Sequence, residues 1–354
     1  MRFPLSEELR QLRNLSDGLK AAYRGSDPHR RVTHFDGWTR RATAEDAGAA
    51  GYDHTQTVAE YYDLCSEFMV FGWGASLHFA PLSPRESLEE SKTRHQRLMI
   101  DKLELSKGMT VIDVGCGIGG PMRRVIREAD VRVIGVNSSD VQLDKAKTLN
   151  AEAGLDHMVD YLPCSFMDMG AISDGTCDRA YAIESTCHAP DKVGAFAEIY
   201  RVLKPGALFW GQEMCMTSTF DPTDERHRHI KKELMHGIAL KDIATMDEVN
   251  RDLETAGFEV IEGIDRAVGE EGPTTPWYLP MEARHGTLGN ALIRMPLGRK
   301  AIFGASRLAE VLGVLPTGSA SVVRLLDRTA NAYVAGRQTG IFTPLYCFLA
   351  RKPL

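Results

Sequence analysis

The stretch V-I-D-V-G-C-G-I-G-G-P, residues 111–121, decides the fold of this chain. Its opening V-I-D-V is rich in β-forming residues and predicts a short buried strand. The glycines that follow predict a turn with few Cβ atoms, so a ligand can lie against bare backbone. A helix is expected over residues 123–128, and Pro121 near its start fits the tolerance of a helix for proline in its first turn. Strand, glycine turn and helix form the opening unit of a nucleotide-binding α/β sheet.

The glycine spacing fits two classes of ligand. Gly115, Gly117 and Gly120 satisfy the G-x-G-x-x-G spacing of dinucleotide sites. Two residues argue against a dinucleotide: Asp113 lies within the strand end, and Asn137 follows the second predicted strand, where NAD sites usually have an acid. The form D-x-G-C-G-x-G-G instead resembles the S-adenosylmethionine loop of class I methyltransferases, whose glycine turn passes close to the cofactor's amino acid and ribose. A plain tight turn between strand and helix is the remaining alternative.

The composition is that of a globular protein without a membrane span. Among 354 residues, 43% are hydrophobic and 25% are charged, and the formal net charge of -6 argues against a general nucleic-acid binder. Seven cysteines without a C-x-x-C pair, and no signal peptide, predict reduced intracellular thiols. No apolar run reaches about 18 residues, so no transmembrane helix is expected. We therefore expect a protein that works in or beside the cytosol, with no metal site.

The order of strand and helix patterns predicts the α/β class, with a seven-stranded doubly wound, Rossmann-like sheet. Strands are expected at residues 110–114, 131–136, 158–162, 179–183, 207–212, 258–264 and 342–350. Helices are expected at residues 87–103, 139–153, 192–202 and 245–256.

Three regions are expected along the chain. Residues 1–56 form an N-terminal helical segment followed by a polar connector that bears arginines. Residues 57–264 form the α/β core, which opens with an aromatic segment at 57–81. Residues 265–354 form a cap over the carboxyl edge of the sheet, because the stretch before the closing strand is far longer than a hairpin needs. Two helices are expected within this cap, at about residues 298–312 and 319–335.

The N-terminal segment carries an apolar stripe. Residues 2–5 with Leu9, Leu12, Leu15 and Leu19 fit one face of an amphipathic helix. Packing on the protein's own core is the favoured interpretation, and contact with a membrane surface is the alternative.

The aromatic segment combines a core helix with an unusual loop. A helix that packs into the core explains an aromatic or leucine at residues 61, 64, 68 and 71. It does not explain Gly72-Trp73-Gly74, where a large aromatic residue lies on a flexible turn beside Ser76 and His78. We therefore expect this loop to contact a ligand.

Polar residues follow the next two strands. Asn137 can accept a hydrogen bond from a ribose hydroxyl, with Gln142 five residues on, although a helix cap at Ser138 or Ser139 is the simpler role for this turn. Beyond the third strand, Phe166 is suited to one face of adenine, with Ser165 beside it. A core-facing aromatic side chain is nearly as good an explanation of Phe166.

The fourth strand ends in Y-A-I-E-S-T-C-H-A-P, residues 181–190. In a parallel sheet, residues just past the carboxyl end of a strand face the ligand crevice. Glu184 and His188 are therefore two ionisable groups at the place where substrate and cofactor should meet. A glutamate after a buried run is a poor choice for structure alone.

Several of these motifs resemble the sterol 24-C-methyltransferase family. The resemblance covers W-G-x-S-x-H-F, the glycine loop, Y-A-I-E-S-T-C-H-A-P, W-Y-L-P at residues 277–280 and G-I-F-T-P-L-Y-C-F-L-A-R-K-P at residues 340–353. It runs from about residue 57 to the end of the sequence. Two positions depart from the family pattern: Ser165 replaces its usual aspartate, and Phe71 its common tyrosine.

The resemblance implies methyl transfer from S-adenosylmethionine to carbon 24 of a sterol side-chain alkene, with S-adenosylhomocysteine as the second product. The transfer passes through a carbocation, which aromatic faces stabilise by about 0.5–2 kcal/mol each, and a base then removes a proton. Glu184, His188 and then His78 are the candidate bases. The expected aromatic faces are Tyr61, Tyr62, Phe68, Phe71, Trp73 and Tyr181. The expected cofactor-binding residues are Asp113, Gly115, Cys116, Gly117, Gly119, Asn137, Gln142, Ser165, Phe166, Tyr62 and Ser76.

A long, rigid, apolar substrate would also account for the cap. Its expected tunnel residues are Trp277, Tyr278, Leu279, Met281, Leu292, Ile293, Met295, Ile302, Phe303, Leu308, Leu312 and Leu315, although packing onto the core explains most of them as well. Two alternatives remain: a methylase of another isoprenoid or fatty-acyl alkene, and a non-catalytic lipid carrier. The resemblance also implies contact with the surface of the endoplasmic reticulum, and a homo-oligomer stays open.

Overall fold

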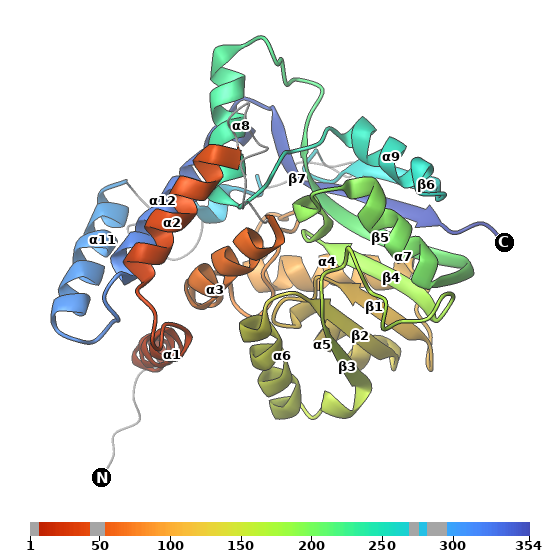
Figure 1. The fold of residues 1–354 in the computed structure, drawn as a ribbon, viewed down its shortest axis with the longest axis horizontal. Helices are drawn as coiled ribbons and strands as arrows, with labels where there is room; N and C mark the ends of the chain where they lie inside the picture. The colour runs from red at the N-terminus through yellow and green to blue at the C-terminus, as the bar shows by residue number, and fades with distance from the viewer. Residues whose placement is uncertain (1–6, 43–53, 269–275, 282–295) are drawn as a thin grey trace.

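A twisted seven-stranded sheet lies at the centre of the molecule (Figure 1). The computed structural model describes residues 7–42, 54–268, 276–281 and 296–354. The strand order is β3-β2-β1-β4-β5-β7-β6, and β1 to β5 pair in parallel while β7 runs antiparallel to both neighbours. The strands are β1 (Thr110–Val114), β2 (Arg132–Asn137), β3 (Val159–Pro163), β4 (Cys177–Ile183), β5 (Leu203–Met216), β6 (Glu259–Asp265) and β7 (Phe342–Arg351). The predicted α/β fold class is confirmed.

Helices cover both faces of the sheet. They are α4 (Leu88–Lys102), α5 (Gly120–Ala129), α6 (Asp140–Glu152), α7 (Lys192–Val202) and α9 (Met246–Thr255), with short 3-10 turns η1 (Asp156–Met158), η2 (Thr186–His188) and η3 (Leu279–Met281). Successive side chains of β5 point to opposite faces of the sheet, as the pleat of a strand requires. Phe209 packs with Phe196 of α7 on one face, and Trp210 packs with His95 of α4 on the other.

A second layer of helices lies beside the sheet, to the left in Figure 1. It comprises α1 (Glu7–Ala22), α2 (Pro28–Ala42), α3 (His54–Trp73), α8 (Glu225–Gly237), α11 (Pro296–Val311) and α12 (Ser319–Gln338). Helix α12 contacts α2, α3, α8 and α11, so this layer draws on both ends of the chain. Phe35, Tyr61 and Leu325 belong to its buried core. The cap is therefore built from N-terminal and C-terminal segments together, rather than from residues 265–354 alone.

The prediction of a connector after the first helix was wrong in part, because residues 28–42 form α2. Asp27 caps this helix, since its Oδ1 accepts hydrogen bonds from the backbone N–H groups of His29 and Arg30. Among the residues of α2 whose burial is described, only Pro28, Val32 and Phe35 are buried, so the apolar signal in the sequence is thin. Helix α8 was likewise not predicted.

The apolar stripe of α1 packs largely on the protein itself. Leu15 and Leu19 are buried in the core of the helical layer, whereas Leu12 is 50% exposed. Residues 2–5 of the predicted stripe lie outside the described residues, as does the side chain of Leu9. Within the described part of the chain, no helix is long and apolar enough to cross a bilayer.

Candidate functional site

Two cavities meet at the carboxyl ends of β1, β2 and β4. The first, the turn cavity, has a volume of about 90 Å³ and is lined by Val58, Ala59, Tyr62, Leu77, His78, Asp113, Gly115, Cys116, Gly117, Ile118, Gly120, Pro121, Asn137, Ser138, Ser139, Gln142, Phe166, Ile183, Glu184, Ser185 and His188. The second, the apolar cavity, has a volume of about 220 Å³ and is lined by Tyr61, Tyr62, Phe68, Met69, Gly72, Trp73, Leu77, His78, Phe79, Glu184, His188, Met214, Ile238, Met281, Leu326, Thr329, Ala330 and Tyr333. The lining residues common to both are Tyr62, Leu77, His78, Glu184 and His188.

The glycine turn after β1 presents bare backbone to the turn cavity. Gly115 and Gly117 have φ angles of 78° and 52°, in the left-handed region that favours glycine. A Cβ atom added at Gly115 would lie 2.3 Å from Cβ of Ser185, so this position has no room for a side chain. At Gly117 the nearest neighbour would be the Gln142 amide at 4.0 Å, so a side chain there would enter the cavity.

Asn137 and Gln142 form one side of the turn cavity. Nδ2 of Asn137 donates to Oε1 of Gln142 (3.0 Å), whose own amide nitrogen donates to Oγ of Ser66 (3.0 Å). The cap of α6 is Ser139, which accepts from the backbone N–H of Gln142 (3.2 Å). Capping is thus done by Ser139, and Asn137 and Gln142 line the cavity.

The other predicted cofactor residues divide into two groups. Cys116 and Phe166 line the turn cavity, as does Tyr62. Ser165, Ser76 and Gly119 are not among its lining residues. The Ser165 hydroxyl accepts a hydrogen bond from the backbone N–H of Met167 (3.2 Å). Binding of the cofactor by Ser165 stays a prediction.

Asp113 is a buried carboxylate at the end of β1. Burial raises its pKa to about 7, and the hydrogen bond from the Tyr181 hydroxyl (2.7 Å) lowers it in part. Tyr181, a residue of β4, is fully buried in the core and belongs to the lining of neither cavity. Its hydroxyl fixes Asp113, so the structure gives it no face toward a substrate in the apolar cavity.

Glu184 stands where the two cavities join. Its φ is 51°, a left-handed conformation that is strained for glutamate and is typical of functional positions. Its Oε1 accepts from the backbone N–H of Phe79 (2.6 Å) and from Nε2 of Gln212 (2.7 Å). Burial raises the pKa of Glu184 to about 8, opposed by the Phe79 hydrogen bond. Without a nearby cation, this carboxyl group therefore holds its proton near neutral pH.

His188 is neutral in this structure. Burial lowers its pKa to about 3. Its Nδ1 lies 3.4 Å from the carbonyl oxygen of Ala239, which can only accept, so Nδ1 carries the proton. Nε2 then accepts from the Tyr62 hydroxyl at 3.0 Å. The pair places the Tyr62 oxygen at the junction of the cavities.

Both ring nitrogens of His78 are engaged. Nδ1 donates to the carbonyl oxygen of Phe79 (2.7 Å), and Nε2 accepts from the amide nitrogen of Gln96 (2.8 Å). Burial lowers the pKa of His78 to about 3. Its remaining capacity to take a proton is therefore small, although its ring lines both cavities.

Aromatic side chains dominate the apolar cavity. Of the predicted faces, Tyr61, Tyr62, Phe68 and Trp73 line it. Phe71 does not, because its side chain is 47% exposed on the far side of α3. The sequence analysis did not predict Tyr333 as a cavity residue. Its position on an amphipathic helix of the cap is the signal that could have indicated it.

Few of the predicted tunnel residues that the structure describes line the apolar cavity. Met281 lines the apolar cavity, and Trp277 packs on Phe79 with ring centroids 5.0 Å apart. The prediction was wrong for Leu308 and Leu312, which are 59% and 67% exposed. Leu292, Ile293 and Met295 lie outside the described residues, and the others are not among the cavity's lining residues.

Comparison with known proteins gives the family. Residues 51–265 match the family model "Mycolic acid cyclopropane synthetase", and residues 292–354 match "Sterol methyltransferase C-terminal". The cycloartenol-C-24-methyltransferase 1 of Oryza sativa subsp. japonica is 41% identical over 88% of this chain and 88% of its own length. The sterol 24-C-methyltransferase of Eremothecium gossypii is 37% identical over 91% and 86%. The chain belongs to the sterol 24-C-methyltransferase family.

Solved structures support the fold of this family member. A geranyl diphosphate C-methyltransferase from Streptomyces coelicolor A3(2), in complex with Mg2+, geranyl diphosphate and S-adenosyl-L-homocysteine, superposes with a TM-score of 0.59. The superposition covers 86% of this chain and 100% of the geranyl diphosphate C-methyltransferase chain, and the two sequences are 17% identical. At that identity the likeness shows the fold alone.

A first prediction concerns the glycine turn of this sterol methyltransferase family member. Gly117→Val places a branched side chain in the turn cavity, so binding of S-adenosylhomocysteine measured by calorimetry should fall below detection. Gly175→Val is the matched control, because Gly175 also has a positive φ (62°), has open space at its Cβ and lines neither cavity. Both variants should unfold cooperatively. Normal binding by Gly117→Val would remove the turn from the site.

A second prediction concerns the pH dependence of stability. The pKa of Glu184 rises from 4.5 in the unfolded chain to about 8 in the folded chain. Between these values the folded chain binds more protons, so the free energy of unfolding falls as pH rises. The stabilisation is complete below pH 4.5 and is lost by about pH 8. Glu184→Gln stays neutral, so its stability relative to the ligand-free parent protein should increase between pH 5 and pH 8.5. Urea unfolding measures this difference, and a constant difference would contradict the raised pKa.

Proposed function

We propose that this protein transfers a methyl group from S-adenosylmethionine to carbon 24 of a sterol side-chain alkene and releases a 24-methylene or other 24-alkyl sterol. The observation that carries the proposal is the junction of the two cavities. A cavity floored by bare glycine backbone meets an aromatic cavity at one buried carboxyl group, Glu184. The sequence identity to sterol and cycloartenol C-24 methyltransferases supplies the substrate class.

The turn cavity fits the methyl donor. The open space beside Gly117 leaves room for a ligand to lie on the backbone, and Asn137 and Gln142 line the wall beside it. Phe166 supplies an apolar face for adenine, and Asp113 a buried acceptor next to the turn. When bound, S-adenosylmethionine supplies an electrophilic methyl group on a positively charged sulfur.

The apolar cavity fits a side chain that becomes positively charged. An alkene that takes up a methyl cation at one carbon leaves a positive charge on the other. Tyr61, Phe68 and Trp73 surround the cavity with aromatic faces, each of which stabilises a cation by about 0.5–2 kcal/mol. Tyr333 adds a fourth face from α12. A hydride shift from carbon 24 to carbon 25 moves the charge to carbon 24, and loss of a proton from the transferred methyl group then gives the 24-methylene product.

Glu184 is the proposed proton acceptor. Both of its hydrogen bonds reach Oε1, so Oε2 remains to take the proton. A sulfonium in the neighbouring cavity opposes the effect of burial and favours the ionised carboxylate. Glu184 would therefore become a base when the donor is bound. His188 is the second candidate, and its neutral ring holds Tyr62, whose hydroxyl oxygen could relay the proton.

The third prediction tests turnover. With labelled S-adenosylmethionine and a panel of Δ24 sterols and fatty-acyl alkenes, we expect labelled 24-alkyl sterols by mass spectrometry. Glu184→Gln should lower turnover by roughly 10²–10⁴-fold, the usual range for acid–base groups, with the affinity for S-adenosylhomocysteine within about tenfold. Glu152→Gln, at the exposed end of α6, is the control. Labelled fatty acids instead of sterols would shift the substrate class, and an undiminished Glu184→Gln would move the base to His188.

We further propose that the protein takes its substrate at a membrane surface such as that of the endoplasmic reticulum. Four apolar side chains at the end of α11 and beyond it are exposed: Leu308 (59%), Val311 (83%), Leu312 (67%) and Val314 (51%). Leu12 of α1 is also exposed (50%), and it precedes by one turn Ser16, whose hydroxyl donates to the carbonyl oxygen of Val314. This apolar patch fits shallow insertion into a bilayer, the phase in which sterols dissolve.

The fourth prediction tests the apolar patch. Val311→Ser combined with Leu312→Ser should lower binding to phosphatidylcholine vesicles containing sterol by about tenfold or more. The double variant lacks two apolar side chains whose transfer from water into the bilayer favours binding. Ile261→Ser combined with Val268→Ser is the matched control, since these side chains are 43% and 58% exposed elsewhere. Vesicle co-sedimentation measures both. Equal binding by the two double variants would exclude the apolar patch as the contact.

A further inference from the structure

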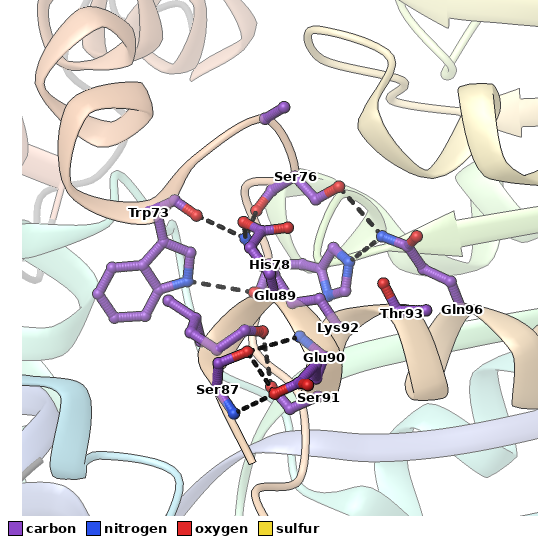
Figure 2. A network of polar contacts seen from close by, with 12 residues as sticks. Trp73, Ser76, His78, Ser87, Glu89, Glu90, Ser91, Lys92, Thr93 and Gln96 are labelled. Atoms are coloured by element: carbon purple, nitrogen blue, oxygen red, sulfur yellow. Dashed lines mark hydrogen bonds and ion pairs between the residues drawn. The ribbon is translucent and has the colours of Figure 1, made fainter. Parts of the chain in front are cut away.

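The segment that separates the two cavities is held from behind by a buried lysine. We call residues 74–78 the dividing loop, because Leu77 and His78 line both cavities. Figure 2 shows Lys92 of α4 reaching the loop as it leaves α3. The Lys92 side chain is 1% exposed, and its Nζ donates to the backbone oxygens of Trp73 (2.5 Å) and Ser76 (3.1 Å). A third bond, to Oε1 of Glu89 (2.5 Å), supplies an opposite charge.

A second side chain of α4 holds the same loop. Gln96 lies one helical turn after Lys92, on the same face. Its amide nitrogen donates to Oγ of Ser76 (3.1 Å) and to Nε2 of His78 (2.8 Å), as Figure 2 shows. The indole N–H of Trp73 closes the loop by donating to the carbonyl oxygen of His78 (3.2 Å). The loop is therefore fixed at its beginning, middle and end.

The dividing loop contacts the machinery on both sides. A Cβ atom added at Gly120 would lie 2.3 Å from the carbonyl oxygen of Ala75, so the loop rests on the glycine turn. The residue that follows the loop, Phe79, donates its backbone N–H to Glu184 and packs its ring in the apolar cavity. A shift of the loop would thus move the floor of one cavity, the wall of the other and the partner of the proposed base.

Retaining a charge at this position is costly unless the charge has a function. Burial lowers the pKa of Lys92, which records the cost of removing its ammonium group from water. An apolar side chain would fill the same space without that cost. The carbonyl oxygens at the carboxyl end of α3 lack partners within the helix, and a cation there also complements the helix dipole. The N–H donors of Lys92 therefore bind the backbone carbonyl oxygens at the start and in the middle of the loop.

We propose that Lys92 is a positioning residue that fixes the dividing loop against both cavities and thereby couples binding of the methyl donor to binding of the sterol. The identity of the second ligand rests on the proposed function. Lys92 does not line either cavity, so it acts through the loop and touches no reacting atom.

The experiment compares Lys92→Met, which keeps an unbranched side chain one atom shorter and removes the three N–H donors, with two further variants. Lys102→Met is the matched control: Lys102 lies on the same helix and forms an ion pair with Glu262, away from both cavities. Lys92→Arg keeps the charge and the donors. For each, calorimetry gives the affinity for S-adenosylhomocysteine with and without a Δ24 sterol, and steady-state kinetics gives kcat and KM well below the melting temperature.

For Lys92→Met we expect a fall in kcat of about 10–100-fold, since a displacement of about 1 Å at a reacting centre can cost about 10²-fold. The affinity for S-adenosylhomocysteine should become independent of the sterol, whereas the parent protein and Lys102→Met bind it more tightly when sterol is present. Lys92→Arg should recover part of the coupling. A lower melting temperature for Lys92→Met with unchanged kcat, affinity and coupling would overturn the proposal.

Two controls keep the outcomes distinct. If the parent protein methylates no sterol, the proposed function fails, and the sterol-free affinity of Lys92→Met for S-adenosylhomocysteine still decides whether the loop is positioned by Lys92. If Lys92→Met does not fold, Gln96→Leu replaces it, because that change removes the other two side-chain bonds to the loop. Wild-type kcat and coupling in Gln96→Leu would then reject the proposal.

Discussion

The site depends on holding one buried carboxyl group at the junction of the two cavities. Glu184 accepts from the Phe79 backbone and from Gln212, and its own backbone adopts a left-handed conformation to reach them. Burial alone keeps this group protonated. A cation in the neighbouring cavity reverses that balance, because opposite charge favours the ionised form. In the proposed mechanism, arrival of the methyl donor would therefore favour the ionised form of Glu184, so the proton acceptor is available only when the donor is bound.

The two cavities differ in how they obtain their shape. The turn cavity follows from local backbone: glycines at positive φ leave space, and the ends of two parallel strands bring Asp113 and Asn137 to one edge. The apolar cavity follows from tertiary packing, since its walls come from α3, β5 and α12. The first therefore needs only the sheet and its turns, while the second also requires the helical layer.

Prediction from sequence succeeded where the signal is local. The β-branched runs and glycine stops placed all seven strands, and the polar residues after β4 placed Glu184 and His188 at the junction of the cavities. It failed where a role depends on a distant partner. Gln212 meets Glu184 across 28 residues and Pro344 across 132, and no pattern around Gln212 announces either contact. Helix α2 was missed because its polar composition hides a narrow buried stripe.

The position of β7 has a consequence for synthesis of the protein. This strand comes after every other described element, yet it lies between β5 and β6, and its Pro344 carbonyl oxygen accepts from Gln212. A growing chain therefore cannot attach β6 to the sheet, or complete the support of Glu184, until residues 342–351 have left the ribosome. Helix α12, which lines the apolar cavity, also emerges late. The apolar cavity and the full set of contacts around Glu184 can therefore form only after α12 and β7 have been made.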